Sequence, residues 1–248
     1  MDMQLFYCKE IAGTGYATLD AEESRHAVRV MRLREGDEIN VTDGKGNLYR
    51  CHIVQAQSDE CVVMSDECIP DSSFITHRSS LHLAVAPTKN PSRMEWLVEK
   101  AVEIGIYEIT LLNCDHSERS FLKTDRLEKL AISAMKQSLH TILPKINPPV
   151  NLSEWLHSPL PPSRGDEGGC LKFIAHCEAD KPRTPLATAL QPDKDAVVLI
   201  GPEGDFSEEE IALALECGFQ PVSLGPSRLR TETAALYAVT AFNLINDK

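Results

Sequence analysis

From residue 81 onward, the sequence alternates between short apolar runs and longer stretches with apolar side chains at helical spacing, and this alternation constrains the fold most strongly. Residues 81–86 and 107–112 have the length and composition of buried strands. Between them, Pro91 suits the first turn of a helix and Gly105 suits its end. Strands joined by helices build a mostly parallel sheet that is covered on both faces. The sequence therefore predicts an α/β fold for this part of the chain.

The rest of this region continues the same pattern. We expect further helices at residues 125–142, 207–217 and 231–245, and further strands at residues 172–176, 197–200 and 222–224. The total length of 248 residues allows one large domain or two modest ones.

The first seventy or so residues instead show strands with one short helix. A capping-box pattern precedes a helix that is expected over residues 21–31. Residues 38–42 and 48–54 flank an Asp-Gly turn, which is typical of a hairpin. We therefore expect a small β-barrel domain over residues 1–72 and the α/β domain over residues 73–248.

The charge of the chain is unevenly distributed along the sequence. A total of 25 basic and 37 acidic side chains gives a formal net charge of −12, which taken alone argues against a nucleic-acid partner. Residues 1–75 carry −7, residues 76–150 carry +2 and residues 151–248 carry −7. Within the first of these segments, a basic helix face is expected from Arg25, Arg29 and Arg32. The middle segment is therefore the least repulsive to a phosphate ligand, and the arginine face is a local exception within the acidic first segment.

Several classes of protein are excluded by what the sequence lacks. No apolar run approaches the roughly 18 residues of a membrane span, and the N-terminus lacks a secretion signal, so we expect a cytoplasmic protein without a membrane partner. The eight cysteines are scattered without a Cys-x-x-Cys pair, and no metal site is expected. The glycine patterns of dinucleotide-binding domains, phosphate loops and serine hydrolases are also absent.

A loop with two glycines follows the strand expected at residues 197–200. Gly201 and Gly204 stand on either side of a Pro-Glu pair, and Ser207 and Glu210 then form a capping box for the next helix. Such a loop lets the backbone approach a ligand closely at the carboxyl end of a strand. An ordinary strand-to-helix turn is the alternative interpretation of this loop alone.

A second loop, residues 225–230, joins a strand to a helix that begins at Thr231. It brings Arg228 and Arg230 close to Glu232 and to the free backbone N–H groups of the helix start. A plain surface loop seldom places so much charge beside an apolar helix. This loop is therefore the strongest functional signal in the chain.

These segments resemble the motifs of a known family. Residues 200–204 and 224–234 are similar to the two cofactor-loop motifs of the bacterial ribosomal RNA small subunit methyltransferase E family, which belongs to the SPOUT superfamily. Residues 26–33 resemble its N-terminal PUA-like barrel, and residues 99–105 and 136–138 resemble its central motifs. The motifs occur in the order of the family over nearly the whole chain.

The resemblance implies an S-adenosylmethionine-dependent methyltransferase that methylates N3 of one uridine in 16S rRNA. It implies a SPOUT-type α/β domain with a deep trefoil knot, which is a rare feature among folds. It also implies a homodimer that acts on 16S rRNA. The uneven charge of the chain favours 16S rRNA in an assembled small subunit over free RNA strands. The residues that it assigns to cofactor binding are Leu199, Ile200, Gly201, Pro202, Glu203, Gly204, Leu224, Gly225, Leu229, Arg230 and Thr231.

Two sets of charged residues are candidates for contacts with the substrate. We expect Arg230 to stabilise or orient the uracil, and Glu232 to position that arginine or to help remove the N3 proton. A structural Arg230–Glu232 ion pair is the alternative. The residues expected to bind RNA are Arg25, Arg29, Arg32, Lys89, Arg93 and Arg119. A solvated charged face is the alternative for each of them.

Some features leave the activity open or separate the chain from the family pattern. The alternative functions are a SPOUT enzyme acting on a ribose 2′-hydroxyl or another base, and a noncatalytic RNA-binding assembly protein.

Asp205 stands where a third glycine is usual, and His140 stands where an arginine is usual. Ser227 and Arg228 replace the usual Arg and Ile.

Overall fold

The computed structural model describes residues 4–13, 15–70, 79–118, 123–158, 169–177 and 182–246. The chain divides into two units. The first unit combines Met1–Thr76 with Ile132–Leu143, and the second combines His77–Ala131 with Pro144–Lys248. The domain boundary expected between residues 72 and 73 lies outside the described residues.

The second unit is built on a seven-stranded sheet in which every neighbouring pair of described strands runs parallel. Its strands are β6 (Leu81–Val85), β7 (Glu108–Asn113), β8 (Lys145–Asn151), β9 (Leu171–Ala175), β10 (Thr184–Pro185), β11 (Ala196–Ile200) and β12 (Gln220–Ser223). They lie in the order β10-β12-β9-β11-β6-β7-β8, so that β11 lies between β9 and β6. All residues of β6 and β11 are buried, as expected for central strands covered on both faces. The predicted parallel α/β fold is confirmed.

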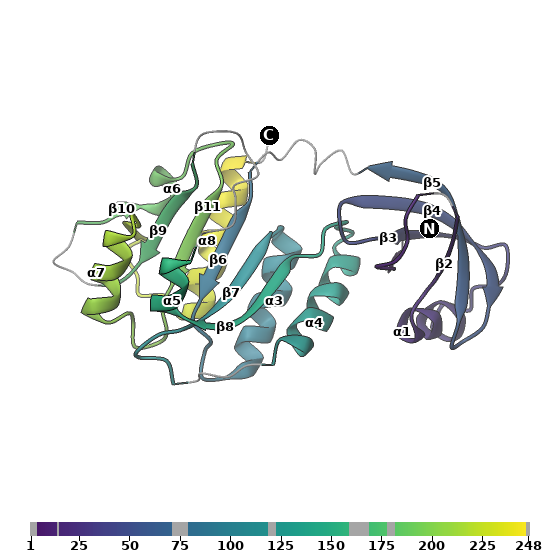
Figure 1. Ribbon diagram of the computed structural model, residues 1–248, viewed down its shortest axis with the longest axis horizontal. Coiled ribbons are helices and arrows are strands. Elements are labelled where there is room, and N and C mark those ends of the chain that lie inside the picture. Colours follow the sequence, from purple (N-terminus) through teal and green to yellow (C-terminus); the bar gives the residue numbers. More distant parts are fainter. Residues whose placement is uncertain are drawn as a thin grey trace. The chain divides into compact units, whose positions relative to one another are not determined.

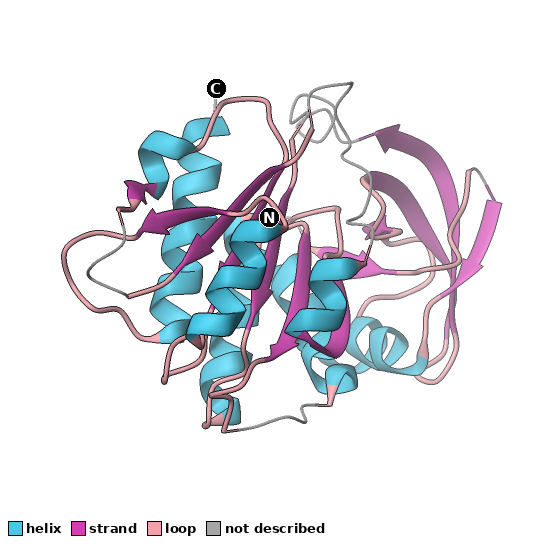
Figure 2. Ribbon diagram, turned by 60° about the vertical axis from the view of Figure 1, so that its left-hand side comes forward, coloured by secondary structure: helices cyan, strands magenta, loops and turns pink. Residues whose placement is uncertain are grey.

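Helices cover both faces of this sheet, as Figure 1 and Figure 2 show. The helices that follow β6 are α3 (Pro91–Ile104), α4 (Thr124–Gln137), α5 (Leu152–His157), α6 (Leu186–Ala189), α7 (Glu208–Glu216) and α8 (Thr231–Asn246). Helix α8 packs against α3, α6, β6 and β11, whereas α5 packs against α7 in a cluster that includes Trp155, Leu199 and Ile211. No helix among the described residues is long and apolar enough to cross a membrane. The trefoil knot that the resemblance implies stays a prediction.

The first unit contains a five-stranded sheet with the order β1-β3-β4-β5-β2. Its strands are β1 (Leu5–Tyr7), β2 (Gly15–Thr18), β3 (Glu38–Thr42), β4 (Asn47–Ala56) and β5 (Cys61–Pro70). The predicted hairpin is confirmed, because β3 and β4 pair antiparallel with Ile39 opposite Cys51. Phe6, Val41 and Val63 are among the side chains that form its core.

The helix predicted over residues 21–31 is confirmed over residues 21–30, but it is not one regular α-helix. An α-helix, α1, covers Ala21–Arg25, and a wider π-helical segment, η1, covers His26–Val30. Arg32, just beyond it, has a left-handed backbone with a φ of 59°. Because the helical period changes along the segment, the three predicted arginines do not follow one α-helical face, although all three are exposed.

The capping box expected at the start of α1 is only half formed. Asp20 caps the helix by accepting hydrogen bonds from two N–H groups of its first turn. A complete box would require the Glu23 side chain to bind back to the Asp20 N–H. The Glu23 carboxylate instead accepts the Tyr7 N–H at 3.3 Å and forms an ion pair with Lys136. This ion pair joins the segment Ile132–Leu143 to α1 within the first unit.

Helix α4 ends at Gln137, five residues before the end that was expected at residue 142. Leu139 follows with a left-handed φ of 60°. The Leu143 N–H then donates to the Gly44 carbonyl oxygen in the β3–β4 turn at 2.9 Å. The prediction of a longer helix is therefore wrong. The β3–β4 turn binds the Leu143 N–H and the Thr141 carbonyl oxygen, so these backbone groups are paired with the hairpin and not within a helix.

We predict that Glu23→Gln lowers the free energy of unfolding by about 2–4 kcal/mol, because it leaves the Lys136 ammonium without its carboxylate. Glu23 is only 3% exposed and the Lys136 side chain 22%, so water replaces the lost carboxylate only in part. The matched control is Glu67→Gln, since the Arg50–Glu67 ion pair is exposed and is worth at most about 1 kcal/mol. Urea unfolding measures both variants, and equally small losses would contradict the structural role of Glu23.

Candidate functional site

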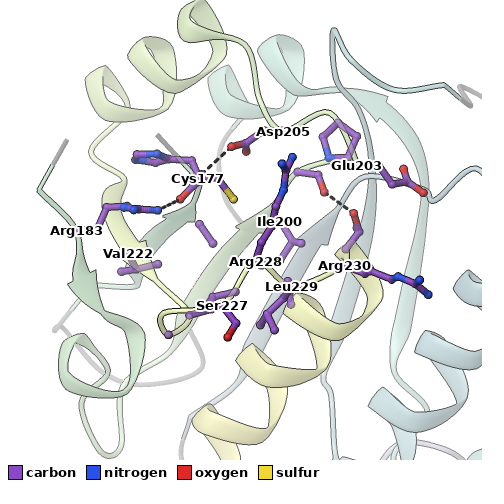
Figure 3. Close-up of a pocket in the computed structure, with 18 residues that line it drawn as sticks. Cys177, Arg183, Ile200, Glu203, Asp205, Val222, Ser227, Arg228, Leu229 and Arg230 are labelled. Carbon is purple, nitrogen blue, oxygen red and sulfur yellow. Dashed lines mark hydrogen bonds between the residues drawn. The ribbon is translucent and has the colours of Figure 1, made fainter. Parts of the chain in front are cut away.

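A cavity of about 330 Å³ opens at the carboxyl ends of three neighbouring strands, β9, β11 and β12. This is the edge at which open parallel sheets bind their ligands, and the volume is in the range of small-molecule sites. Figure 3 shows the residues that line it, which are Ala175, His176, Cys177, Arg183, Ile200, Gly201, Pro202, Glu203, Asp205, Val222, Leu224, Gly225, Ser227, Arg228, Leu229, Arg230, Thr231 and Ala234.

The first wall of the cavity is the loop that follows β11. A Cβ atom on Gly201 would lie 3.0 Å from the Phe206 ring, so a side chain there would have to displace that ring slightly. Helix α7 then begins with the predicted capping box, which is confirmed. The Ser207 hydroxyl accepts the Glu210 N–H, and the Glu210 carboxylate accepts the Ser207 N–H. The loop is therefore held at both of its ends.

The second wall is the loop between β12 and α8. Gly225 has a φ of 106°, a conformation that favours glycine. At the end of this loop, the Thr231 hydroxyl donates to the Gly201 carbonyl oxygen at 3.1 Å. Thr231 is buried, so this hydrogen bond connects the two predicted loops inside the protein. Both loops thus border one cavity.

The third wall comes from the end of β9 and was not predicted. The Cys177 N–H donates to Asp205 Oδ2 at 2.7 Å, and the Arg183 guanidinium donates to the His176 carbonyl oxygen (Figure 3). The available sequence signal was that His176 and Cys177 stand at the end of an expected strand. Their position beside the loop after β11 depends on the pairing of β9 with β11. The sequence does not show this pairing, because the two strands are distant in the chain.

Asp205 connects the first wall to the third. It has a φ of 66°, which costs a nonglycine residue roughly 1–2 kcal/mol. One carboxylate oxygen accepts the Cys177 N–H, and the other accepts the Phe206 N–H at 2.9 Å. His116 Nδ1 lies 3.1 Å from the Asp205 carbonyl oxygen. These contacts stabilise an aspartate in a backbone conformation that suits glycine.

Charged groups of both signs surround the cavity. They are the guanidinium groups of Arg183, Arg228 and Arg230 and the carboxylates of Glu203 and Asp205. Partial burial raises the pKa of the Cys177 thiol, and Asp205 adds to this effect while Arg228 and Arg183 oppose it. The thiol is therefore neutral near pH 7. No cluster of three or more His, Cys, Asp or Glu side chains in the described part of the chain could hold a metal ion.

Nine of the eleven residues that were predicted to bind a cofactor line the cavity. The other two, Leu199 and Gly204, do not. Leu199 is buried in the apolar cluster beneath α7. A Cβ atom on Gly204 would lie 3.0 Å from His116 Cβ, so this glycine packs against a neighbouring loop. The role of all eleven in cofactor binding stays a prediction.

The two predicted catalytic residues have different surroundings. Arg230 lines the cavity and is exposed. Glu232 is only 6% exposed, and its Oε1 atom lies 3.7 Å from Arg93 Nε. Its Oε2 atom accepts no hydrogen bond from any described residue. The ion pair of Glu232 is therefore with Arg93 and not with Arg230.

The predicted RNA-binding residues are at the surface where the structure describes them. The first unit exposes Arg25, Arg29 and Arg32. In the second unit, Lys89 Nζ lies 2.6 Å from Glu118 Oε2, which raises the pKa of the lysine. Arg93 lies beside Glu232. An RNA phosphate that approached Lys89 or Arg93 would therefore compete with the carboxylate already paired with that residue. Arg119 lies outside the described residues.

Comparison with protein families gives two matches along the chain. The model for an RNA methyltransferase domain matches residues 76–243, and the model for an RNA methyltransferase PUA domain matches residues 19–63. The chain is 30% identical over 245 residues to ribosomal RNA small subunit methyltransferase E of Aquifex aeolicus (strain VF5). That similarity covers 96% of this chain and 98% of the relative.

Several solved structures share the fold over nearly the full length, and two of them illustrate the similarity. The crystal structure of a probable rRNA-methyltransferase from Porphyromonas gingivalis is 37% identical with a TM-score of 0.85, covering 98% of both chains. Ribosomal RNA small subunit methyltransferase E from Neisseria gonorrhoeae, bound to S-adenosyl methionine, is 25% identical with a TM-score of 0.77. That similarity also covers 98% of both chains.

We predict that Asp205→Ala lowers the free energy of unfolding by about 2–4 kcal/mol, because it removes both carboxylate hydrogen bonds and leaves alanine at a positive φ. Asp205→Gly loses the same hydrogen bonds but relieves the backbone, so its loss is smaller, about 1–2 kcal/mol. Urea unfolding compares the two variants. An alanine variant as stable as the glycine variant would contradict this explanation of the loop.

Proposed function

The chain belongs to the ribosomal RNA small subunit methyltransferase E family, and we propose on this basis that it methylates N3 of one uridine in 16S rRNA with S-adenosylmethionine as methyl donor. The observation that carries the proposal is the cavity at the carboxyl ends of β9, β11 and β12, where both predicted cofactor loops meet. The family member from Neisseria gonorrhoeae, which shares this fold, is bound to S-adenosyl methionine.

The groups that line the cavity suit S-adenosylmethionine. Apolar side chains such as Ile200, Leu224 and Leu229 offer surfaces for the adenine ring and the aliphatic carbons. Apart from Gly225 and its two chain neighbours, no heavy atom lies within 4 Å of the position where Gly225 would carry a Cβ, so a ligand can approach the backbone there. Charged groups of both signs match a ligand that has cationic and anionic parts. The residues of the two predicted loops would hold the donor.

When bound, S-adenosylmethionine supplies an electrophilic methyl group on its sulfonium sulfur. Uracil N3 reacts through its lone pair, so its imide proton has to be removed before or during the transfer. Glu232 Oε2 is a buried acceptor without a donor among the described residues, and we assign to it the acceptance of that proton. Arg93, 3.7 Å from the other carboxylate oxygen, holds the carboxylate in position.

Arg230 has the complementary role in this proposal. Loss of the imide proton leaves negative charge on the uracil carbonyl oxygens, which a guanidinium group stabilises. Arg230 is exposed at the cavity, and Figure 3 shows its guanidinium pointing away from Cys177 and Asp205. It is therefore available to a base that approaches the cavity from outside.

We propose that the substrate is 16S rRNA within an assembled small subunit. A chain with a formal net charge of −12 binds free RNA strands poorly, since phosphates are attracted mainly by Lys and Arg. Local contacts from the exposed Arg25, Arg29 and Arg32, together with Lys89 and Arg93, favour an RNA of fixed shape. The match of residues 19–63 to an RNA methyltransferase PUA domain supports a role of the first unit in RNA binding.

We also propose that the protein is a homodimer. Helices α3 and α8 pack side by side, and each exposes large apolar side chains. Trp96 on α3 is 46% exposed, and Tyr237 and Leu244 on α8 are 40% and 70% exposed. Exposed apolar groups on neighbouring helices are typical of a protein interface. A second copy of this chain is the occupant proposed for this surface.

We predict that the purified protein transfers one methyl group per small ribosomal subunit taken from cells that lack it. Digestion of the 16S rRNA to nucleosides and mass spectrometry should yield 3-methyluridine, with much slower methylation of free 16S rRNA. A 2′-O-methylated nucleoside or another methylated base would contradict the proposed target. Absence of any methylation with RNA binding retained would instead support a noncatalytic assembly role.

We predict that Glu232→Gln lowers kcat about 10²- to 10⁴-fold while the affinity for S-adenosylmethionine stays within about twofold, because an amide does not accept the N3 proton. The rate of this variant should rise with pH more steeply than that of the wild type, because the uracil then loses its proton to solvent. Glu95→Gln is the control, since Glu95 forms a surface ion pair with Arg126. A full kcat in Glu232→Gln would remove Glu232 from the mechanism.

A further inference from the structure

Two arginines without a predicted role in cofactor binding line the cavity near Cys177. Arg183 lies just before β10, and Arg228 lies in the loop before α8. Both oppose the rise in the pKa of the Cys177 thiol, so their positive charges are close to this residue. Figure 3 shows the Arg228 side chain extending along the cavity toward Asp205, with Arg183 reaching the same side from another segment.

The carboxylates of Asp205 and Glu203 already accept hydrogen bonds from backbone N–H groups. Both oxygens of Asp205 accept N–H groups, from Cys177 at 2.7 Å and from Phe206 at 2.9 Å. Glu203 Oε1 accepts the Lys89 N–H at 3.1 Å. Within the described residues, no ion pair joins Arg183 or Arg228 to an acidic side chain. The two guanidinium groups therefore keep donors for an anionic ligand.

We infer that Arg228 and Arg183 together bind the carboxylate of the amino-acid portion of S-adenosylmethionine, and so select ligands that carry this group. The role rests on the proposed function, since it concerns the same cavity and the same donor. The carboxylate is the one anionic group of S-adenosylmethionine, whereas its ammonium and sulfonium groups are cationic. Guanidinium groups bind carboxylates through paired, charge-assisted N–H···O bonds. The same charges repel the sulfonium, which orients the ligand within the cavity.

The position of the two arginines favours a small carboxylate over an RNA phosphate. Both side chains line a cavity of about 330 Å³, which suits a small molecule. Arg183 is only partly exposed, and one of its N–H groups is already bound to the His176 carbonyl oxygen. A phosphate of a folded RNA would meet the outer surface more readily than this cavity wall. RNA binding by Arg228 is therefore the alternative that the experiment has to separate.

Isothermal titration calorimetry with two nucleosides tests the inference. S-adenosylhomocysteine carries the amino-acid portion, whereas 5′-methylthioadenosine lacks it. In Arg228→Met and in Arg183→Met, we expect the affinity for S-adenosylhomocysteine to fall about tenfold to a hundredfold, as for loss of a hydrogen bond to a charged group. The affinity for 5′-methylthioadenosine should stay within about twofold. Arg126→Met, at an arginine that is 75% exposed and paired with Glu95, should change neither affinity.

The outcomes separate this inference from the proposed function. An unchanged affinity of both methionine variants for S-adenosylhomocysteine would overturn the carboxylate role, and so would equal losses for both nucleosides. A loss confined to RNA affinity would assign Arg228 to the substrate instead. A wild-type protein that binds neither nucleoside would contradict the proposed function itself. Thermal unfolding of each variant verifies that the fold is intact, and partial recovery in Arg228→Lys would support the role of charge.

Discussion

Burial of a parallel sheet on both faces limits where this protein can place polar chemistry. Strands β6 and β11 are fully buried, so ligand-binding groups have to come from loops beyond the strand ends. The strand order brings β12, β9 and β11 side by side, although other elements separate them in the sequence. Two hydrogen bonds, from Thr231 to Gly201 and from Cys177 to Asp205, then hold three loops around one cavity.

Hydrogen bonds outside the cavity support its first wall. The Asp115 N–H donates to Glu210 Oε1 at 2.9 Å, and the Ser207 hydroxyl donates to Asp115 Oδ2 at 2.7 Å. The loop after β7 is thereby joined to the start of α7, which directly follows the Gly201 loop. A wall that is fixed before binding lowers the entropy cost of holding a ligand. The buried Glu232 and its neighbour Arg93 come from the first turns of α8 and α3, so rigid helices position the proposed base.

Local sequence patterns were sufficient where neighbours in the sequence determine the structure. The two glycine loops, the capping box of α7 and the β3–β4 hairpin were predicted because turns and caps involve adjacent residues. The third wall was missed because it depends on the pairing of β9 with β11. The half-formed capping box of α1 and the early end of α4 differ from the predictions because tertiary contacts engage Glu23 and the segment before Leu143. The resemblance predicts a glycine at the position of Asp205, and the φ of 66° observed there is a conformation that glycine adopts readily.

A crystal structure with S-adenosylhomocysteine tests the central claim most directly. The cavity between the loops that begin at Gly201 and Leu224 should contain the ligand, with its amino-acid portion directed toward Arg228 and Arg183. The Thr231–Gly201 and Cys177–Asp205 hydrogen bonds should be unchanged, because both already connect the loops that line the cavity. Ligand bound at another place, or an empty cavity at concentrations that saturate the protein in solution, would contradict the assignment of this cavity to the methyl donor.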